Sequence, residues 1–262
     1  KFILIFSNYI IILGGYMRGK THCTIGILST IQACILFKIP ISIFNLVLAA
    51  IFSILPDLDE SNSTISNVFL KQDASKLILK IVIYIINFAI FFISLKINNN
   101  NFFLSSIVTF IAIMVLESKI NHILLRKILL SLTLILLSLC LFFIKVKIYF
   151  VIFFLMLASF PWLKHRSFSH SIFAIIVIYF LLKQIEIIYN ISNLSFFGTI
   201  GYASHLFLGD LFTKSGIPLF YPISNKKYSL GYFRVGSFFN NALEILIVVI
   251  LVGSIIFSTI KI

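Results

Sequence analysis

Three short stretches of this sequence carry histidines and aspartates at spacings that metal-dependent chemistry uses: 56-PDLD-59, 165-HRSFSHS-171 and 205-HLFLGD-210. Neutral imidazole and carboxylate are the ligand types that zinc and similar divalent ions take in hydrolytic sites. A further histidine lies in 17-MRGKTHCTIG-26. The candidate metal ligands are therefore His22, Asp57, His165, His170, His205 and Asp210.

Residues beside these candidates could assist the chemistry. In an extended segment after Pro56, Asp57 and Asp59 would point the same way, so that they could bridge two metals or divide into ligand and base. Arg166 could hold a phosphate or carboxylate with two hydrogen bonds. Neighbouring serines of the same stretch could cap the following helix or orient ligands. We predict catalytic roles for Asp59, Arg166 and Glu244.

The spacing between His205 and Asp210 conflicts with a regular helix. Residues five apart on an α-helix point about 140° away from each other, whereas residues four apart lie within about 40°. Gly209, next to the acid, permits a π-bulge that absorbs one extra residue. The two side chains can therefore share a site only if the helix is distorted between them.

The elements that must position these residues are apolar helices. The chain has 262 residues, of which 60% are hydrophobic and 11% charged, and its long apolar runs are hydrophobic all round. A membrane-crossing helix needs about 17–25 such residues. We therefore predict an all-α, polytopic transmembrane helical bundle of eight or nine spans, near 22–37, 41–55, 77–95, 102–116, 124–144, 148–163, 171–189, 197–213 and 243–260.

The loop charges predict an orientation. When the chain weaves from Met17, the loops on the Met17 side carry most of the lysines and arginines, which makes that side cytoplasmic. The candidate ligands fall at the same face, and ionisable residues at membrane depth suggest a functional site. The net charge of +13 is thereby explained by topology, and no nucleic acid is expected. We predict a multi-pass protein of the cytoplasmic membrane whose partner is the lipid bilayer.

Two parts of the chain are distinguished. Residues 1–16 are interpreted as an upstream extension or weak anchor, because Met17 follows a short apolar run that lacks a convincing cleavage site. Residues 17–262 are predicted to form a single membrane-embedded helical domain.

Read in order, the motifs 17-MRGKTHCTIG-26, 55-LPDLDESNS-63, 165-HRSFSHS-171 and 201-GYASHLFLGDLFTKSGIPLFYP-222, with a late glutamate, resemble the YdjM-type membrane-bound metal-dependent hydrolases. That family is thought to be distantly related to zinc-dependent phospholipase C and P1-type nucleases. The resemblance implies a metal-dependent hydrolase in which the six candidate ligands hold the metal. This chain departs from the pattern in two ways: extra apolar helices lie between Asp57 and His165, and His205 and Asp210 are one residue further apart than is usual.

The leading hypothesis is a metal-dependent hydrolase acting at the cytoplasmic membrane face. One or two divalent ions, with zinc as the first expectation, would activate a water that attacks an ester or phosphodiester, and the location suggests a lipid-derived substrate. Two alternatives stay open: a transporter, which would need ionisable residues lining a path at the bilayer midplane, and a non-catalytic membrane protein with a structural metal site.

Overall fold

The structure is a computed structural model that describes residues 18–260. The predicted extension 1–16 and Met17 therefore lie outside the described residues. Within the described range the chain is helical, with irregular connections and an isolated bridge between Ile217 and Tyr228. The predicted all-α class is confirmed.

Each predicted helix falls on an observed one, although three were predicted too long by several residues. The ranges 41–55 and 148–163 end as α-helices at Phe52 and Ser159, and the range 197–213 breaks into three pieces. A short helix after the PDLD motif was not predicted. The elements, with η marking short 3-10 turns and the π-helical η4, are α2 (Arg18–Phe37), α3 (Ile43–Phe52), η1 (Leu55–Asp59), α4 (Thr64–Phe69), α5 (Gln72–Ile97), α6 (Phe102–Lys119), α7 (His122–Phe143), α8 (Ile148–Ser159), η2 (Phe160–Trp162), η3 (Phe168–His170), α9 (Ile172–Tyr189), α10 (Leu194–Ser204), η4 (His205–Gly209), η5 (Asp210–Phe212) and α11 (Phe238–Ile260).

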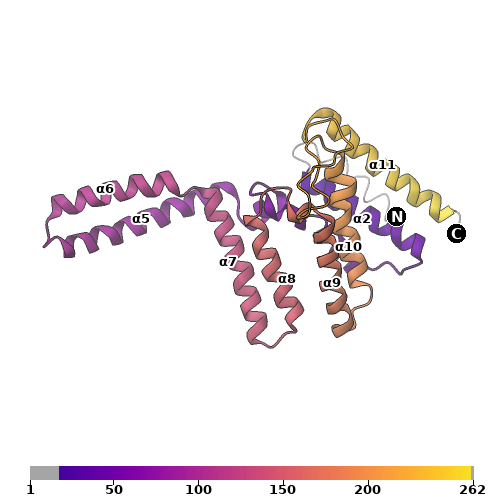
Figure 1. Cartoon of the computed structure of the whole chain (residues 1–262), viewed down its shortest axis with the longest axis horizontal. Helices are drawn as coiled ribbons and strands as arrows, with labels where there is room; N and C mark the ends of the chain where they lie inside the picture. The colour runs from indigo at the N-terminus through magenta and orange to yellow at the C-terminus, as the bar shows by residue number, and fades with distance from the viewer. Residues whose placement is uncertain (1–17, 261–262) are drawn as a thin grey trace.

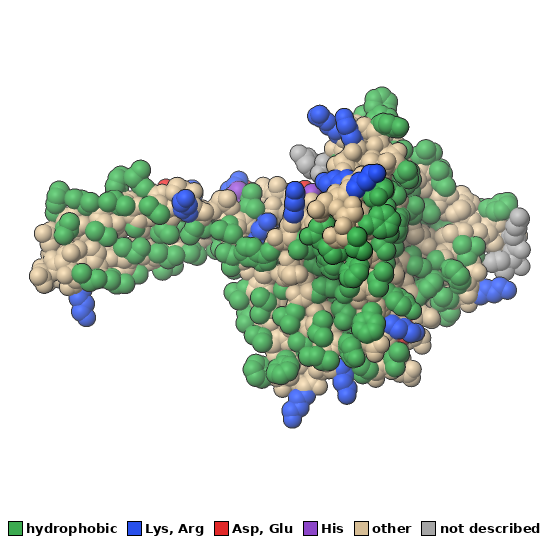
Figure 2. All heavy atoms as spheres, in the orientation of Figure 1, with side chains coloured by type: hydrophobic (Ala, Val, Ile, Leu, Met, Phe, Trp, Pro, Cys, Tyr) green, Lys and Arg blue, Asp and Glu red, His purple; other side chains and the backbone are tan. Residues whose placement is uncertain are grey.

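Five helices of the described chain are long and apolar enough to cross a membrane: α5, α6, α7, α9 and α11. The stretch formed by α8 and η2 is apolar but shorter. Large hydrophobic side chains are exposed along all of these helices, as lipid-facing surfaces require. Figure 2 shows them over the visible face of the molecule, with lysines and arginines mainly at helix ends and loops.

The helices form a bundle with a hairpin projecting from it (Figure 1). Helix α7 packs against α8, α9 packs against α10, and α10 also contacts α3 and α2. Helix α11 lies along α2. The α5–α6 hairpin extends away from the bundle, and α5 contacts α7 near its root. Because the hairpin projects in this way, both of its helices are exposed on most sides.

Asparagines close two of the hairpins, α5–α6 and α9–α10. Asn99, Asn100, Asn190 and Asn193 have positive φ angles, which asparagine tolerates better than most residues. The side chain of Asn101 then accepts a hydrogen bond from the amide of Leu104 and caps α6. The turns are therefore built from the residue type that their geometry demands.

The core lies among α3, α8, α9 and α10. Phe160, Ile178, Phe197, Tyr202 and Leu206 are fully buried there. Above this core, the short turn η1 contacts both η2 and η3, and η4 contacts α2. The three motif-bearing stretches thus meet at one end of the bundle.

Candidate metal centre

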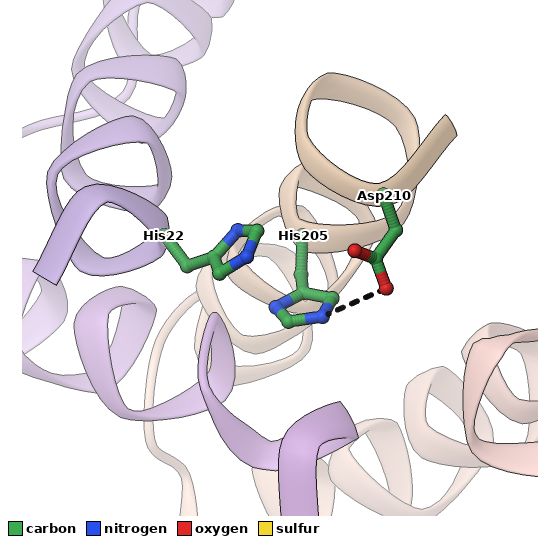
Figure 3. A group of neighbouring side chains, drawn as sticks. All are labelled: His22, His205 and Asp210. Atoms are coloured by element: carbon green, nitrogen blue, oxygen red, sulfur yellow. Dashed lines mark ion pairs between the residues drawn. The ribbon is translucent and has the colours of Figure 1, made fainter. Parts of the chain in front are cut away.

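The helix that carries His205 is distorted between His205 and Asp210, where the five-residue spacing of the two side chains required a distortion. Residues His205–Gly209 form a π-helical turn, and Asp210 opens the 3-10 turn that follows. His205 Nε2 and Asp210 Oδ2 then lie 3.6 Å apart (Figure 3). The predicted π-bulge is confirmed, and the extra residue is absorbed without turning the two side chains away from each other.

Gly209 has a second role at this turn. A Cβ atom placed on it would lie 2.4 Å from Cε1 of His22, which comes from α2. Because the glycine lacks that atom, the rings of His22 and His205 approach to 4.0 Å between centroids (Figure 3). A histidine far away in the sequence thereby joins the cluster.

The ring of His205 is fully buried and held in one orientation. Its Nδ1 lies 2.7 Å from the carbonyl oxygen of Ser53 and donates to it, since a carbonyl can only accept. The other nitrogen, Nε2, therefore carries the lone pair and faces Asp57 Oδ1 at 3.5 Å as well as Asp210. A hydrogen bond that fixes the tautomer in this way is typical of metal-binding histidines.

The two aspartates of 56-PDLD-59 point to different partners. The motif forms the 3-10 turn η1 rather than an extended segment, so the prediction that Asp57 and Asp59 face the same way is wrong. Asp57 faces His205, whereas Asp59 faces the 165–170 stretch. Burial raises the pKa of Asp57 to about 6, with the charge of His22 opposing the rise. A pair that bridges two metals is not the arrangement seen here.

Asp59 holds the HRSFSH stretch in place. Its fully buried carboxylate lies 2.8 Å from His165 Nδ1 and 3.2 Å from His170 Nδ1. It also accepts hydrogen bonds from the amide of Arg166 and the hydroxyl of Ser169. Burial alone would raise the pKa of Asp59, but its bonds to the two histidines hold the pKa well below its usual range. These bonds make Asp59 an acceptor that orients histidines.

His170 is fully buried between two carboxylates. Its Nδ1 faces Asp59, and its Nε2 lies 3.0 Å from Asp210 Oδ2, although these two atoms are not aligned as a hydrogen bond. Burial lowers the pKa of His170, but the two neighbouring carboxylates outweigh burial and raise the pKa to about 10. A metal ion at Nε2 would therefore have to displace a proton.

Arg166 supports the cluster from behind. Its guanidinium is 7% exposed and donates to Asp210 Oδ1 at 2.6 Å, to Thr213 Oγ1 at 2.9 Å and to the hydroxyl of Ser215. One carboxylate oxygen of Asp210 is thus occupied, which turns the other toward His170 and His205. We predicted that Arg166 would contact a substrate. In the structure its guanidinium instead binds side chains of the protein itself.

Two groups of three residues in the described chain bring potential ligand atoms within 4.8 Å of one another. One group is His22, His205 and Asp210, and the other is Asp57, His170 and His205. Of the six candidate ligands, only His165 lies outside both groups. Its side chain is 42% exposed and bonded to Asp59. Neither group contains Glu244, whose carboxylate accepts a hydrogen bond from Asn240 on α11.

Unpartnered polar atoms test whether these residues fit a metal. A buried polar atom without a hydrogen bond is costly, and each one calls for an explanation. Four such atoms of the described residues converge here: His22 Nδ1, His170 Nε2, His205 Nε2 and Asp210 Oδ2. Nitrogen and oxygen donors in this combination fit a zinc-type divalent ion.

Some supporting groups were found by sequence reasoning and others were missed. Ser169 bonds Asp59, and Ser171 caps α9 by accepting from the amide of Ala174, as the serine pattern indicated. The Ser53 carbonyl and the Tyr202 hydroxyl, which donates to the Ser169 carbonyl at 2.5 Å, were missed. Partnerships with backbone carbonyls leave no signal in residue types, because every residue has such an oxygen.

The fold and site together define an all-helical membrane protein with a buried histidine–aspartate cluster at one end of its bundle. The model of the YdjM inner membrane protein family matches residues 17–261, so the chain belongs to this family. The predicted family is confirmed. Neither the curated proteins nor the solved structures gave a significant match.

Proposed function

We propose that this protein is an integral membrane hydrolase that uses one or two divalent metal ions, with zinc as the first expectation. The ligands would be drawn from a set of five residues: His22, Asp57, His170, His205 and Asp210. The observation that carries the proposal is the convergence of four buried, unpartnered nitrogen and oxygen atoms from three separate parts of the chain. One or two metal ions would satisfy them, since His22 belongs to one group of potential ligands and His170 to the other.

Such an ion, when bound, would lower the pKa of a water to about 7 so that hydroxide is available as the nucleophile. The chain's own residues prepare the site. The Ser53 carbonyl and the Asp59 carboxylate fix the tautomers of His205 and His170, and Arg166 orients Asp210. This network makes Asp59 and Arg166 positioning residues in the proposed mechanism.

His165 is proposed to move the proton. Its Nδ1 is held by Asp59, and its exposed ring lies 5.6 Å from the ring of His170, measured between centroids. A histidine oriented by a buried carboxylate is a common general acid or base. It would protonate the leaving group. The five clustered residues would then serve only as ligands of the ion. The metal-ligand role predicted for His165 is thus replaced in this proposal.

The substrate class follows from location. The cluster lies at one end of an apolar bundle, at the face that the loop charges predict to be cytoplasmic. An ester or phosphodiester of a lipid-derived molecule could reach this depth, and the predicted relation to phospholipase C and P1-type nucleases agrees with that chemistry. We further propose that the shorter apolar helices also cross the membrane, which would give the predicted eight or nine spans.

Metal analysis of detergent-purified protein tests the proposal. The wild-type protein should hold one or two ions per chain, and a His170→Ala, His205→Ala double variant should hold almost none. His122→Ala, which changes a histidine outside both ligand groups, is the matched control. Equal and negligible metal in wild type and double variant would contradict the proposal.

Hydrolysis assays then separate an enzyme from a structural metal site. Phosphodiester and phospholipid analogues should be cleaved by the wild type, and His165→Ala should lose most of this activity while retaining its metal. Metal binding without hydrolysis of any analogue would favour the structural alternative instead.

A further inference from the structure

A buried arginine lies outside the metal centre, on α7. Arg126 is 3% exposed, and its NH2 group donates to Asn67 Oδ1 at 2.9 Å. Its Nε and NH1 atoms are buried without any hydrogen-bond partner. Most of the hydrogen-bonding capacity of this guanidinium is therefore unused.

This arginine also lacks a carboxylate. Among the ion pairs formed by the described residues, none involves Arg126, and its one hydrogen-bond partner is a neutral amide. A buried charge without a counter-ion is strongly destabilising. Arg166, by contrast, is buried against Asp210. The burial of Arg126 is explained if an anion from outside the chain binds its guanidinium and serves as the counter-ion.

A pocket lies at this arginine, and its lining suits such an anion. Arg126 and Lys127 supply two cations and Ser61 supplies a hydroxyl, while Ser66, whose hydroxyl donates to the Glu60 carbonyl, lines the pocket together with Phe69 and Leu58. The enclosed part of the pocket is about 10 Å³, room for one water-sized group such as a phosphate oxygen, and the rest of the pocket is open to the outside. The pocket borders the turn η1, because Leu58, which follows Asp57 and precedes Asp59, is part of its lining.

We propose that the Arg126 pocket, formed by these six residues, binds a phosphate group. Arginine presents parallel N–H donors that match two phosphate oxygens, and the lysine and the hydroxyl of Ser61 can bind the others. Arg126 lies near the start of α7, at the end of the helix where the loop charges predict the cytoplasmic interface. The phosphate would come from a lipid headgroup or from a free phosphate compound.

Binding measurements on detergent-purified protein test this site with two probes, inorganic phosphate and short-chain phosphatidic acid. A diacylglycerol of the same chain length controls for apolar binding. Arg126→Met should weaken phosphate-dependent binding at least about tenfold, because it removes the charged hydrogen bonds to the phosphate oxygens. Lys145→Met, which removes an exposed cation beyond the other end of α7, should leave binding unchanged. His205→Ala should also bind normally, which separates this site from the metal centre.

The two probes distinguish the source of the phosphate. Binding of inorganic phosphate that competes with phosphatidic acid would indicate a free compound, whereas Arg126-dependent binding of phosphatidic acid alone would indicate a lipid headgroup. Failure of the wild type to bind either probe, or equal binding by Arg126→Met, would overturn the proposal. Should Arg126→Met not fold, Arg126→Lys and Lys127→Met decide the matter: reduced binding in either supports the site, and unchanged binding in both refutes it.

Discussion

The α9–α10 and α5–α6 hairpins are both closed by asparagine turns, yet they are buried very differently. Helix α9 buries Ala174, Ile178, Leu181, Leu182 and Ile185, whereas α6 buries a single residue, Ser105. The residues that α5 buries are mostly polar: Ser75, Asn87 and Ser94. One hairpin packs apolar side chains into the core that supports the metal centre. The other keeps small polar residues inside and leaves its apolar residues for lipid, which suggests that the site depends on the first and not on the second.

The largest effect is expected from adding a side chain where α10 and α3 lie in close contact. A Cβ atom on Gly201 would lie 2.4 Å from the backbone oxygen of Ala49 on α3, and a backbone cannot easily move aside. Gly201→Val should therefore destabilise the protein by about 3 kcal/mol or more and abolish metal binding. Thermal unfolding and metal content measure this. Gly253→Val on α11, where a Cβ meets nothing within 4 Å, is the control.

The next effect concerns the carboxylate that orients the histidines. Asp59→Asn keeps the shape of the side chain but loses the charge that holds His170 and His165. Partners of metal ligands typically contribute 10- to 100-fold to affinity, so zinc binding should weaken by about that factor. Competition with a chelator of known affinity measures it, and unchanged affinity would argue that the cluster is not the metal site.

Metal binding should also depend on pH. Because the pKa of His170 is raised to about 10 and binding requires its neutral form, one proton is released per ion at neutral pH. The affinity should fall about tenfold for each unit that the pH drops between roughly 9 and 7. Below about pH 6 the fall should steepen, because Asp57 then takes up a proton as well. Titration at several pH values tests this, and a flat profile would contradict it.

The smallest effect is expected from removing the projecting hairpin. Replacing α5 and α6 with a short polar linker removes helices that contact the rest of the chain mainly where α5 meets α7. Metal content should stay as in the wild type, with at most a small loss of stability. A variant that folds but loses its metal would show that the hairpin supports the site after all, and the contrast between the two hairpins would fail.

Sequence reasoning succeeded where a local rule governs the structure. Apolar run length predicted the helices, and the spacing of His205 and Asp210 with Gly209 predicted the π-helical turn. Residue type and spacing are sufficient in each of these cases, because the interactions involved are short-range.

Sequence reasoning was less successful where contacts between residues far apart in the sequence determine the structure. The direction of Asp57 and Asp59 depends on a 3-10 turn that packs against the 165–170 stretch, and the inward path of Arg166 depends on Asp210. Neither contact is visible in the spacing of residues. The unpartnered guanidinium of Arg126 was missed for the same reason, since in the sequence it looks like any basic residue at a membrane boundary.

The π-helical turn also shows how the chain accommodates one residue more than a regular helix allows. Removing Leu208 would restore a four-residue interval, so His205 and Asp210 could still share a face of a regular α-helix. Because the wide turn already absorbs the extra residue, the segment after the deletion would keep its rotation about the helix axis. Thr213 and Ser215 would then stay beside the guanidinium of Arg166. The turn therefore marks a place where the length of the chain can change by one residue while the side chains on either side keep their directions.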